Sequence, residues 1–131
     1  MRVARALADE RGSSPVEFLL VGTLLTALTL GVLQLALAVY VRNVVHDAAV
    51  EGAYHGALAD VTTDAGALRT RRIIERTVGD GFAEAVTARD STALGHDTVE
   101  VTVVTRLPLI GLLGVPRGWE VTARAPAESF D

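Results

Sequence analysis

The stretch "EFLLVGTLLTALTLGVLQLALAVYVR", residues 17–42, decides the fold of this chain. Between Glu17 and Arg42 it holds twenty-four consecutive residues without a charge, Phe18–Val41. As an α-helix with a rise of about 1.5 Å per residue, this run is roughly 36 Å long, and a bilayer's hydrocarbon core is about 30 Å thick. The sequence therefore predicts one transmembrane helix.

The placement of arginines around this run predicts its orientation. Arg2, Arg5 and Arg11 precede the run, whereas only Arg42 follows it closely. The positive-inside tendency puts the N-terminus in the cytoplasm and residues 42–131 outside. A cleaved secretory signal is an alternative, because "ALA" at residues 36–38 offers small residues to a signal peptidase. The apolar region of a signal peptide has about 7 to 15 residues, and this apolar run is longer, so a retained anchor is favoured.

The composition limits the class of protein. The 131 residues suffice for one domain, of which about ninety residues remain outside the lipid. All basic residues are arginine, which is typical of a GC-rich bacterial genome. The net charge of -4 does not favour nucleic-acid binding, and the absence of cysteine excludes disulfides and thiolate metal sites.

The segment after the apolar run continues a helical pattern. Small and apolar residues recur at steps of three and four through residues 41–56, which predicts an extended helix with a face suited to close packing on another helix. This stripe comprises Val41, Val44, Val45, Ala48, Ala49, Gly52, Ala53 and Gly56. A second amphipathic helix is predicted over about Ala65–Ala88, with "VGDGF" at residues 78–82 expected to kink or split it. Its apolar side is predicted to carry Leu68, Ile74, Val78, Phe82, Ala85 and Val86.

Two stretches near the C-terminus alternate apolar and polar residues, which predicts strands. The first stretch is "DTVEVTVVTRL", residues 97–107, in which Val99, Val101 and Val103 alternate with Glu100, Thr102 and Thr105. The second is "WEVTARA", residues 119–125, which repeats the pattern. We expect an antiparallel hairpin across the apolar connection 107–116, which either packs beneath its own domain or touches a membrane or a neighbour. The predicted class is α+β, with a long N-terminal transmembrane and amphipathic helix, a second helix and a C-terminal hairpin.

This pattern divides the chain into four parts. They are a cytoplasmic leader at 1–12, a transmembrane helix at 13–41, an extracytoplasmic continuation of that helix at 42–62 and a small α+β extracytoplasmic domain at 63–131.

The residues that begin the helix allow two interpretations. Ser14, Pro15 and Glu17 form the pattern of a capping box with proline at the first helical position. A glutamate in the first turn also complements the helix dipole. On this interpretation, Glu17 only helps to start a helix at the membrane surface.

The second interpretation comes from a resemblance. Arg11 and Gly12, a short polar turn, an acid and an unbroken apolar helix resemble the type IV prepilin leader, and specifically the TadE-like family of pseudopilins in tight-adherence (Flp) pilus systems. The similarity covers residues 11 to about 59 and, loosely, the C-terminal hairpin. It implies a pilin-like fold and cleavage after Gly12 by a prepilin peptidase, which leaves Ser13 first and Glu17 fifth in the mature chain. It also implies, as partners, other pilin or pseudopilin subunits and the inner-membrane pilus assembly platform.

Charge and shape give this resemblance a physical basis. After cleavage, Ser13 would carry an amine that is cationic near neutral pH, and Glu17 of one subunit could pair with the amine of a neighbour in a poorly hydrated setting. A face of small residues and one amide would let such helices approach closely, unless these residues are merely the ordinary content of a membrane helix. This face comprises Gly22, Thr23, Thr26, Ala27, Gly31 and Gln34.

Signals for an enzyme are weak. His46, His55 and His96 lack the spacing of a metal site, and the chain has neither a GxSxG motif nor a phosphate-binding glycine loop, so no catalytic residue, metal or cofactor is predicted. Arginines at 69, 71, 72 and 76 are read as a solvated helix face or as a contact for an acidic partner. The predicted function is a non-enzymatic pseudopilin-like subunit in the cytoplasmic membrane and, once assembled, in a pilus at the cell surface. The alternative is an uncleaved, single-pass, membrane-anchored extracytoplasmic binding or adaptor protein.

Overall fold

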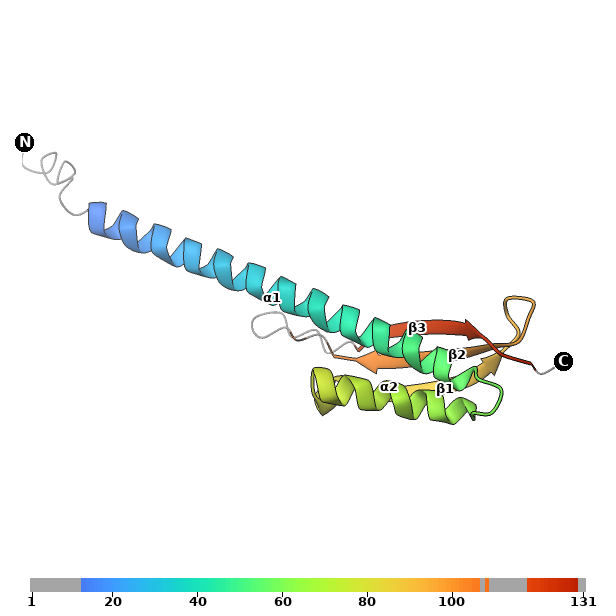
Figure 1. Cartoon of the computed structure of the whole chain (residues 1–131). Helices are drawn as coiled ribbons and strands as arrows, with labels where there is room; N and C mark the ends of the chain where they lie inside the picture. The colour runs from blue at the N-terminus through green and yellow to red at the C-terminus, as the bar shows by residue number, and fades with distance from the viewer. Residues whose placement is uncertain (1–12, 107, 109–117, 130–131) are drawn as a thin grey trace, which may run out of the picture. The chain divides into compact units, whose positions relative to one another are not determined.

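The computed structural model describes residues 13–106, 108 and 118–129 and divides into two compact units, Met1–Ala36 and Leu37–Asp131. The class is α+β: a long apolar N-terminal helix, a second helix and a three-stranded antiparallel sheet, which confirms the predicted fold class (Figure 1). The elements are α1 (Ser13–Gly56), α2 (Thr63–Thr77), the short 3-10 helix η2 (Asp80–Phe82), β1 (Ala85–Ser91), β2 (Thr98–Thr105) and β3 (Trp119–Pro126).

The first unit contains only the start of α1 among its described residues. Helix α1 is long and apolar enough to cross a membrane. The hydroxyls of Thr23, Thr26 and Thr29 each donate a hydrogen bond of 2.8 Å to the backbone carbonyl four residues earlier. Because these polar groups are satisfied within the helix, they add little to the cost of placing it in lipid.

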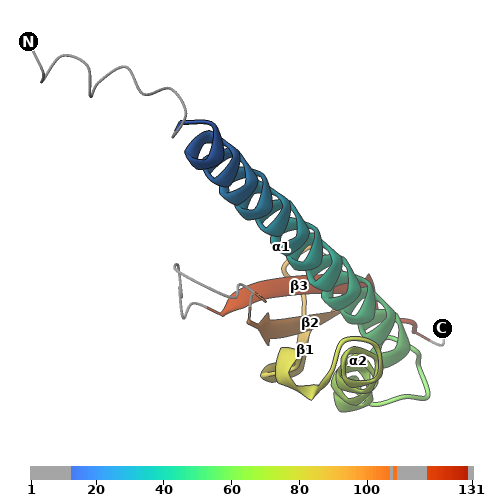
Figure 2. The ribbon, with the colours of Figure 1, turned by 90° about the vertical axis from the view of Figure 1, so that its left-hand side faces the viewer.

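The second unit is built on the sheet, whose strands lie in the order β1, β2, β3. The central strand β2 places Val99, Val101 and Val103 on one face, where alanine or valine of β3 lies opposite each of them. Figures 1 and 2 show α2 and the C-terminal part of α1 side by side against the sheet. The valines of β2 and Ile74 of α2 are buried in one core with residues of α1.

The stripe of small residues predicted over 41–56 is the buried face of α1 in this unit. Its glycines let α2 approach very closely. A Cβ atom built on Gly66 of α2 would lie 2.5 Å from the carbonyl oxygen of Gly52, and one on Gly52 would lie 1.8 Å from Oγ1 of Thr70. That hydroxyl donates to the carbonyl of Ala48 across the helix pair, at 3.2 Å. The predicted helix-packing face therefore has its partner within the same chain.

Helix α2 is shorter than predicted, and this part of the prediction is wrong. It ends at Thr77. Shortly after this end, Gly79 has a φ of +108°, a conformation that residues other than glycine rarely adopt. Residues 85–88, the last part of the predicted helix, lie in β1 instead, because this strand pairs along its whole length with β2. A helical reading of these residues fails because tertiary pairing, which the local pattern does not contain, decides their state.

The apolar side predicted for the second helix is also wrong in part. Leu68 is 61% exposed, whereas Gly66, Thr70 and Ile74 are the buried residues of α2. The narrow spacing from α1 excludes a leucine at the contact and selects small residues. Thr105, predicted on the polar side of its strand, is buried on the same face as Val103.

Helix α1 begins at Ser13, so Ser14 lies within the helix and is not its N-cap. Pro15 still falls in the first turn, where the backbone N–H groups have no intrahelical acceptor. Proline is therefore compatible with this start.

Candidate functional site

The start of α1 carries the residues predicted for processing and charge pairing. Ser13 and Glu17 are exposed, and as residues four apart in one helix they lie on the same face. Gly12, the other half of the predicted cleavage site, lies outside the described residues. The predicted processing and pairing therefore stay predictions.

The predicted packing face of the membrane segment is open. No atom of the residues that the structure describes lies within 4 Å of a Cβ atom built on Gly22 or Gly31. At 3.6 residues per turn, the small residues and Gln34 gather on one half of the helix. The other half carries the exposed side chains of Val21, Leu24, Leu25, Leu28, Val32 and Leu35. Between Gly22 and Gln34, one half of the helix thus presents mainly small side chains, although Leu30 and Leu33 also lie on it.

A contact between an arginine and a tryptophan lies at the end of the apolar run. The guanidinium carbon of Arg42, the first charge after the run, lies 4.3 Å from the ring centroid of Trp119 at the start of β3. This is the geometry of a cation–π interaction. Sequence reasoning missed this pair, although the chain has a single tryptophan and a first arginine after the span to draw attention to them.

A second charged group crosses the outer face of the sheet. Glu100 of β2 is flanked in register by Arg89 of β1 and Arg124 of β3, and both arginines donate hydrogen bonds to its carboxylate. The Glu100 side chain is only 3% exposed. The hydrogen bonds from the two arginines hold the pKa of Glu100 below its ordinary value, and the bond from Arg89 has the larger effect. Only the strand register reveals this triad, so the sequence pattern could not predict it.

The arginines predicted as a cluster on the second helix have different surroundings. Arg69 pairs with Glu51 of α1, and Arg71 donates to the carbonyl of Ala83 at 3.2 Å. Arg72 and Arg76 are exposed and form no ion pair with any residue that the structure describes. The cluster is therefore partly structural and partly a solvated face.

The three histidines do not gather. His46 and His96 are exposed and His55 is half-buried. Within 13–106, 108 and 118–129, no three potential metal-ligating side chains come together.

One comparison with known proteins agrees with the N-terminal resemblance. No curated protein and no solved structure matches this chain. Residues 12–53 match the family model described as TadE-like protein, and the match includes Gly12, Glu17 and most of α1. This family is a structural one associated with Tad/Flp pili. Over residues 12–53, therefore, this chain is similar to the TadE-like family.

Proposed function

We propose that this protein is a non-enzymatic, pseudopilin-like subunit in the assembly of a Flp/tight-adherence pilus. In this proposal a prepilin peptidase cleaves the leader after Gly12, and the mature subunit packs through its N-terminal helix with sister subunits and the inner-membrane platform. The observation that carries the proposal is the family match, which begins at Gly12 and runs through the apolar helix. The leader is cytoplasmic and the second unit extracytoplasmic.

Two segments of α1 support a division of tasks along this helix. Between Val41 and Gly56 the small-residue face is buried within the chain's own second unit. Between Gly22 and Gly31 the corresponding face is open. Packing with sister subunits therefore uses the earlier face, because the later one is already occupied.

The start of the helix supports the charge-pairing step. Because Ser13 and Glu17 share a face of α1, cleavage would place an amine and a carboxylate in one small patch. The same patch on a neighbouring subunit can pair with it, and a neighbour out of register would leave a charge unpaired in a poorly hydrated setting. Glu17 thus favours one register between the helices of neighbouring subunits.

Mass spectrometry of the mature N-terminus tests the processing step. We expect a chain that begins at Ser13 when the protein is produced with its peptidase. Gly12→Asp should abolish this product and leave membrane insertion unchanged, because the change affects the scissile bond and not the span. An intact Met1, or a start at Val39 after the "ALA" sequence, would contradict the proposal and favour the uncleaved adaptor or a secretory signal.

A separate experiment tests the role of Glu17. Glu17→Ala should leave processing largely intact and reduce incorporation of the subunit into the pilus or its initiation complex. Asp47→Ala is the matched control, since it removes an exposed carboxylate from the same helix outside the apolar run. Equal assembly of the wild-type protein and the Glu17 variant would defeat the pairing step.

A further inference from the structure

One end of the second unit coincides with the end of the apolar run. Tyr40 and Val41 complete this run, and Arg42 follows as the first charge. Trp119 stacks on Arg42, and the register pairs Trp119 with Thr105, the last residue of β2. The end of β2 and the start of β3 therefore lie at the level where α1 becomes polar.

Helix α2 brings further arginine to this end. It runs antiparallel to α1, because Gly66 lies against Gly52 and Gly56 while Thr70 reaches back to Ala48. Its last turn, with Arg76, therefore approaches the level of Arg42.

The end of β2 adds another arginine. Arg106 follows β2 and makes two hydrogen bonds to Glu84, at 3.1 and 2.8 Å. This salt bridge pairs the charge of Arg106 with that of Glu84, so the two together add no net charge to this end. Further acids of the same end are Glu75 in the last turn of α2, Asp80 just after that helix and Glu120 beside Trp119.

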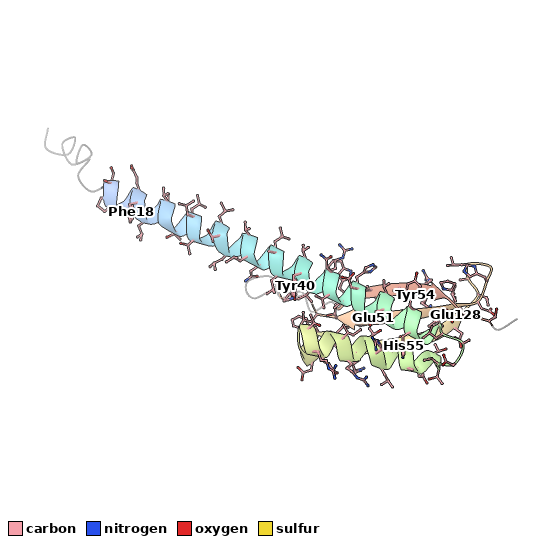
Figure 3. The ribbon with its side chains drawn as sticks, in the orientation of Figure 1. Phe18, Tyr40, Glu51, Tyr54, His55 and Glu128 are labelled. Atoms are coloured by element: carbon pink, nitrogen blue, oxygen red, sulfur yellow. The ribbon has the colours of Figure 1, made fainter. Side chains whose placement is uncertain are left out.

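The opposite end of the unit is acidic. The backbone N–H of Glu128 donates to the carbonyl of Ala57, just past the end of α1, and that of Ala127 donates to the carbonyl of Asp97. Thr63, the first residue of α2, donates to Asp90 at 2.7 Å. Figure 3 shows Tyr40 and Glu128 at opposite ends of the unit. Acids of this end are Asp60, Asp64, Asp90, Asp97 and Glu128.

We infer that the end of the second unit formed by Tyr40, Arg42, Arg76, Arg106 and Trp119, the arginine–tryptophan end, rests on the headgroup layer of the bilayer. Tryptophan and tyrosine prefer this layer, because their rings are apolar and their N–H or O–H groups can remain hydrated. Arginine beside them can bind the phosphates of lipids. Because acids lie at both ends of the unit, it is the aromatic rings beside Arg42 and Arg76, and not the net charge, that distinguish this end.

This inference rests on the membrane anchor of the proposed function and adds a second, lateral contact with lipid. It concerns the folded unit and not only the helix that spans the bilayer. The contact would hold the β2–β3 end of the sheet at the membrane surface before the subunit enters a pilus. The kind of partner is a phospholipid headgroup.

The single tryptophan makes the inference measurable. The full chain is reconstituted into vesicles of phosphatidylcholine and phosphatidylglycerol that contain a headgroup-linked nitroxide lipid, and Trp119 fluorescence is compared with that in unlabelled vesicles. We expect about a twofold loss of emission, as for an aromatic residue at the headgroup level. A lipid with its quencher at the end of the acyl chain should quench less.

Two variants calibrate the measurement in a Trp119→Phe background. Tyr40→Trp places the probe at the end of the apolar run and should be quenched. Leu94→Trp places it in the exposed turn between β1 and β2, near the acidic end, and should emit equally with and without the nitroxide lipid. Circular dichroism verifies that both variants fold like the wild type.

The outcomes separate the inference from the anchor on which it depends. Trp119 quenched like Tyr40→Trp supports the inference. If Trp119 is unquenched, as Leu94→Trp is, while Tyr40→Trp is quenched, the inference is overturned and the anchor remains supported. If Tyr40→Trp is also unquenched, or the chain does not float with the vesicles, both the anchor and the inference fail.

Discussion

The close crossing of α1 and α2 makes Gly66→Ala the most informative substitution in the second unit. A Cβ atom at residue 66 would lie 2.5 Å from the carbonyl oxygen of Gly52 and 3.2 Å from Cα of Gly56. Both neighbours are backbone atoms of a helix, so no side chain can rotate away. The two helices must move apart, and this opens the core around Ile74.

The magnitude follows from two opposing terms. Overpacking of this kind costs typically 1 to 3 kcal/mol, and a contact with rigid backbone puts Gly66→Ala at the upper end, about 3 kcal/mol. Alanine returns about 1 kcal/mol through its better helix propensity. The net loss is about 2 kcal/mol, which in a unit of about 95 residues lowers the melting temperature by about 10 °C.

Thermal unfolding of the full chain in detergent micelles, followed by circular dichroism and Trp119 fluorescence, measures this loss. Gly81→Ala is the control, because this residue is exposed and, within the described part of the chain, no atom lies within 4 Å of a Cβ atom built on it. It should change stability by less than about 0.5 kcal/mol. If Gly66→Ala melts at or above the wild-type temperature, helix propensity alone governs this site and the close crossing is wrong.

Three further substitutions give predictions of different kinds. Glu100→Gln should lower the stability of the second unit by about 2 kcal/mol, since charged hydrogen bonds to two arginines are weakened. Because the pKa of Glu100 is lower in the folded chain than its ordinary value of 4.5, this contribution is complete above about that pH and is lost as the pH falls toward the folded pKa. Melting curves from pH 7 to pH 3 should therefore converge for wild type and variant, and a constant difference would contradict the assignment. Pro15→Ala should speed processing after Gly12, because proline lacks an N–H and restricts the chain near the scissile bond; equal cleavage rates in a time course with the peptidase would remove Pro15 as an influence. Arg69→Ala should change stability by no more than about 0.5 kcal/mol despite its salt bridge with Glu51, since both side chains are about half exposed, and urea unfolding measures this.

The sequence by itself determined the elements whose signal is local. Twenty-four uncharged residues are sufficient to indicate the apolar helix, because the cost of burying charge in lipid acts on each residue independently of the fold. The small-residue stripe from Val41 to Gly56 and the alternation of β2 and β3 are likewise local periodicities, and each element contains them. The motif around Gly12 and Glu17 is also linear, so the order of residues alone carries the TadE-like resemblance.

Only the tertiary structure decided which surfaces meet. Residues 85–91 carry a weak pattern of their own and become β1 because β2 offers a free edge in register. The exposed Leu68 and the buried Thr70 follow from a helix separation that the glycines of α1 set. The Arg89–Glu100–Arg124 triad and the Arg42–Trp119 contact join residues distant in the chain, whose proximity depends on strand pairing and helix packing. Local periodicity specifies which face of an element is buried, but long-range packing specifies what covers it.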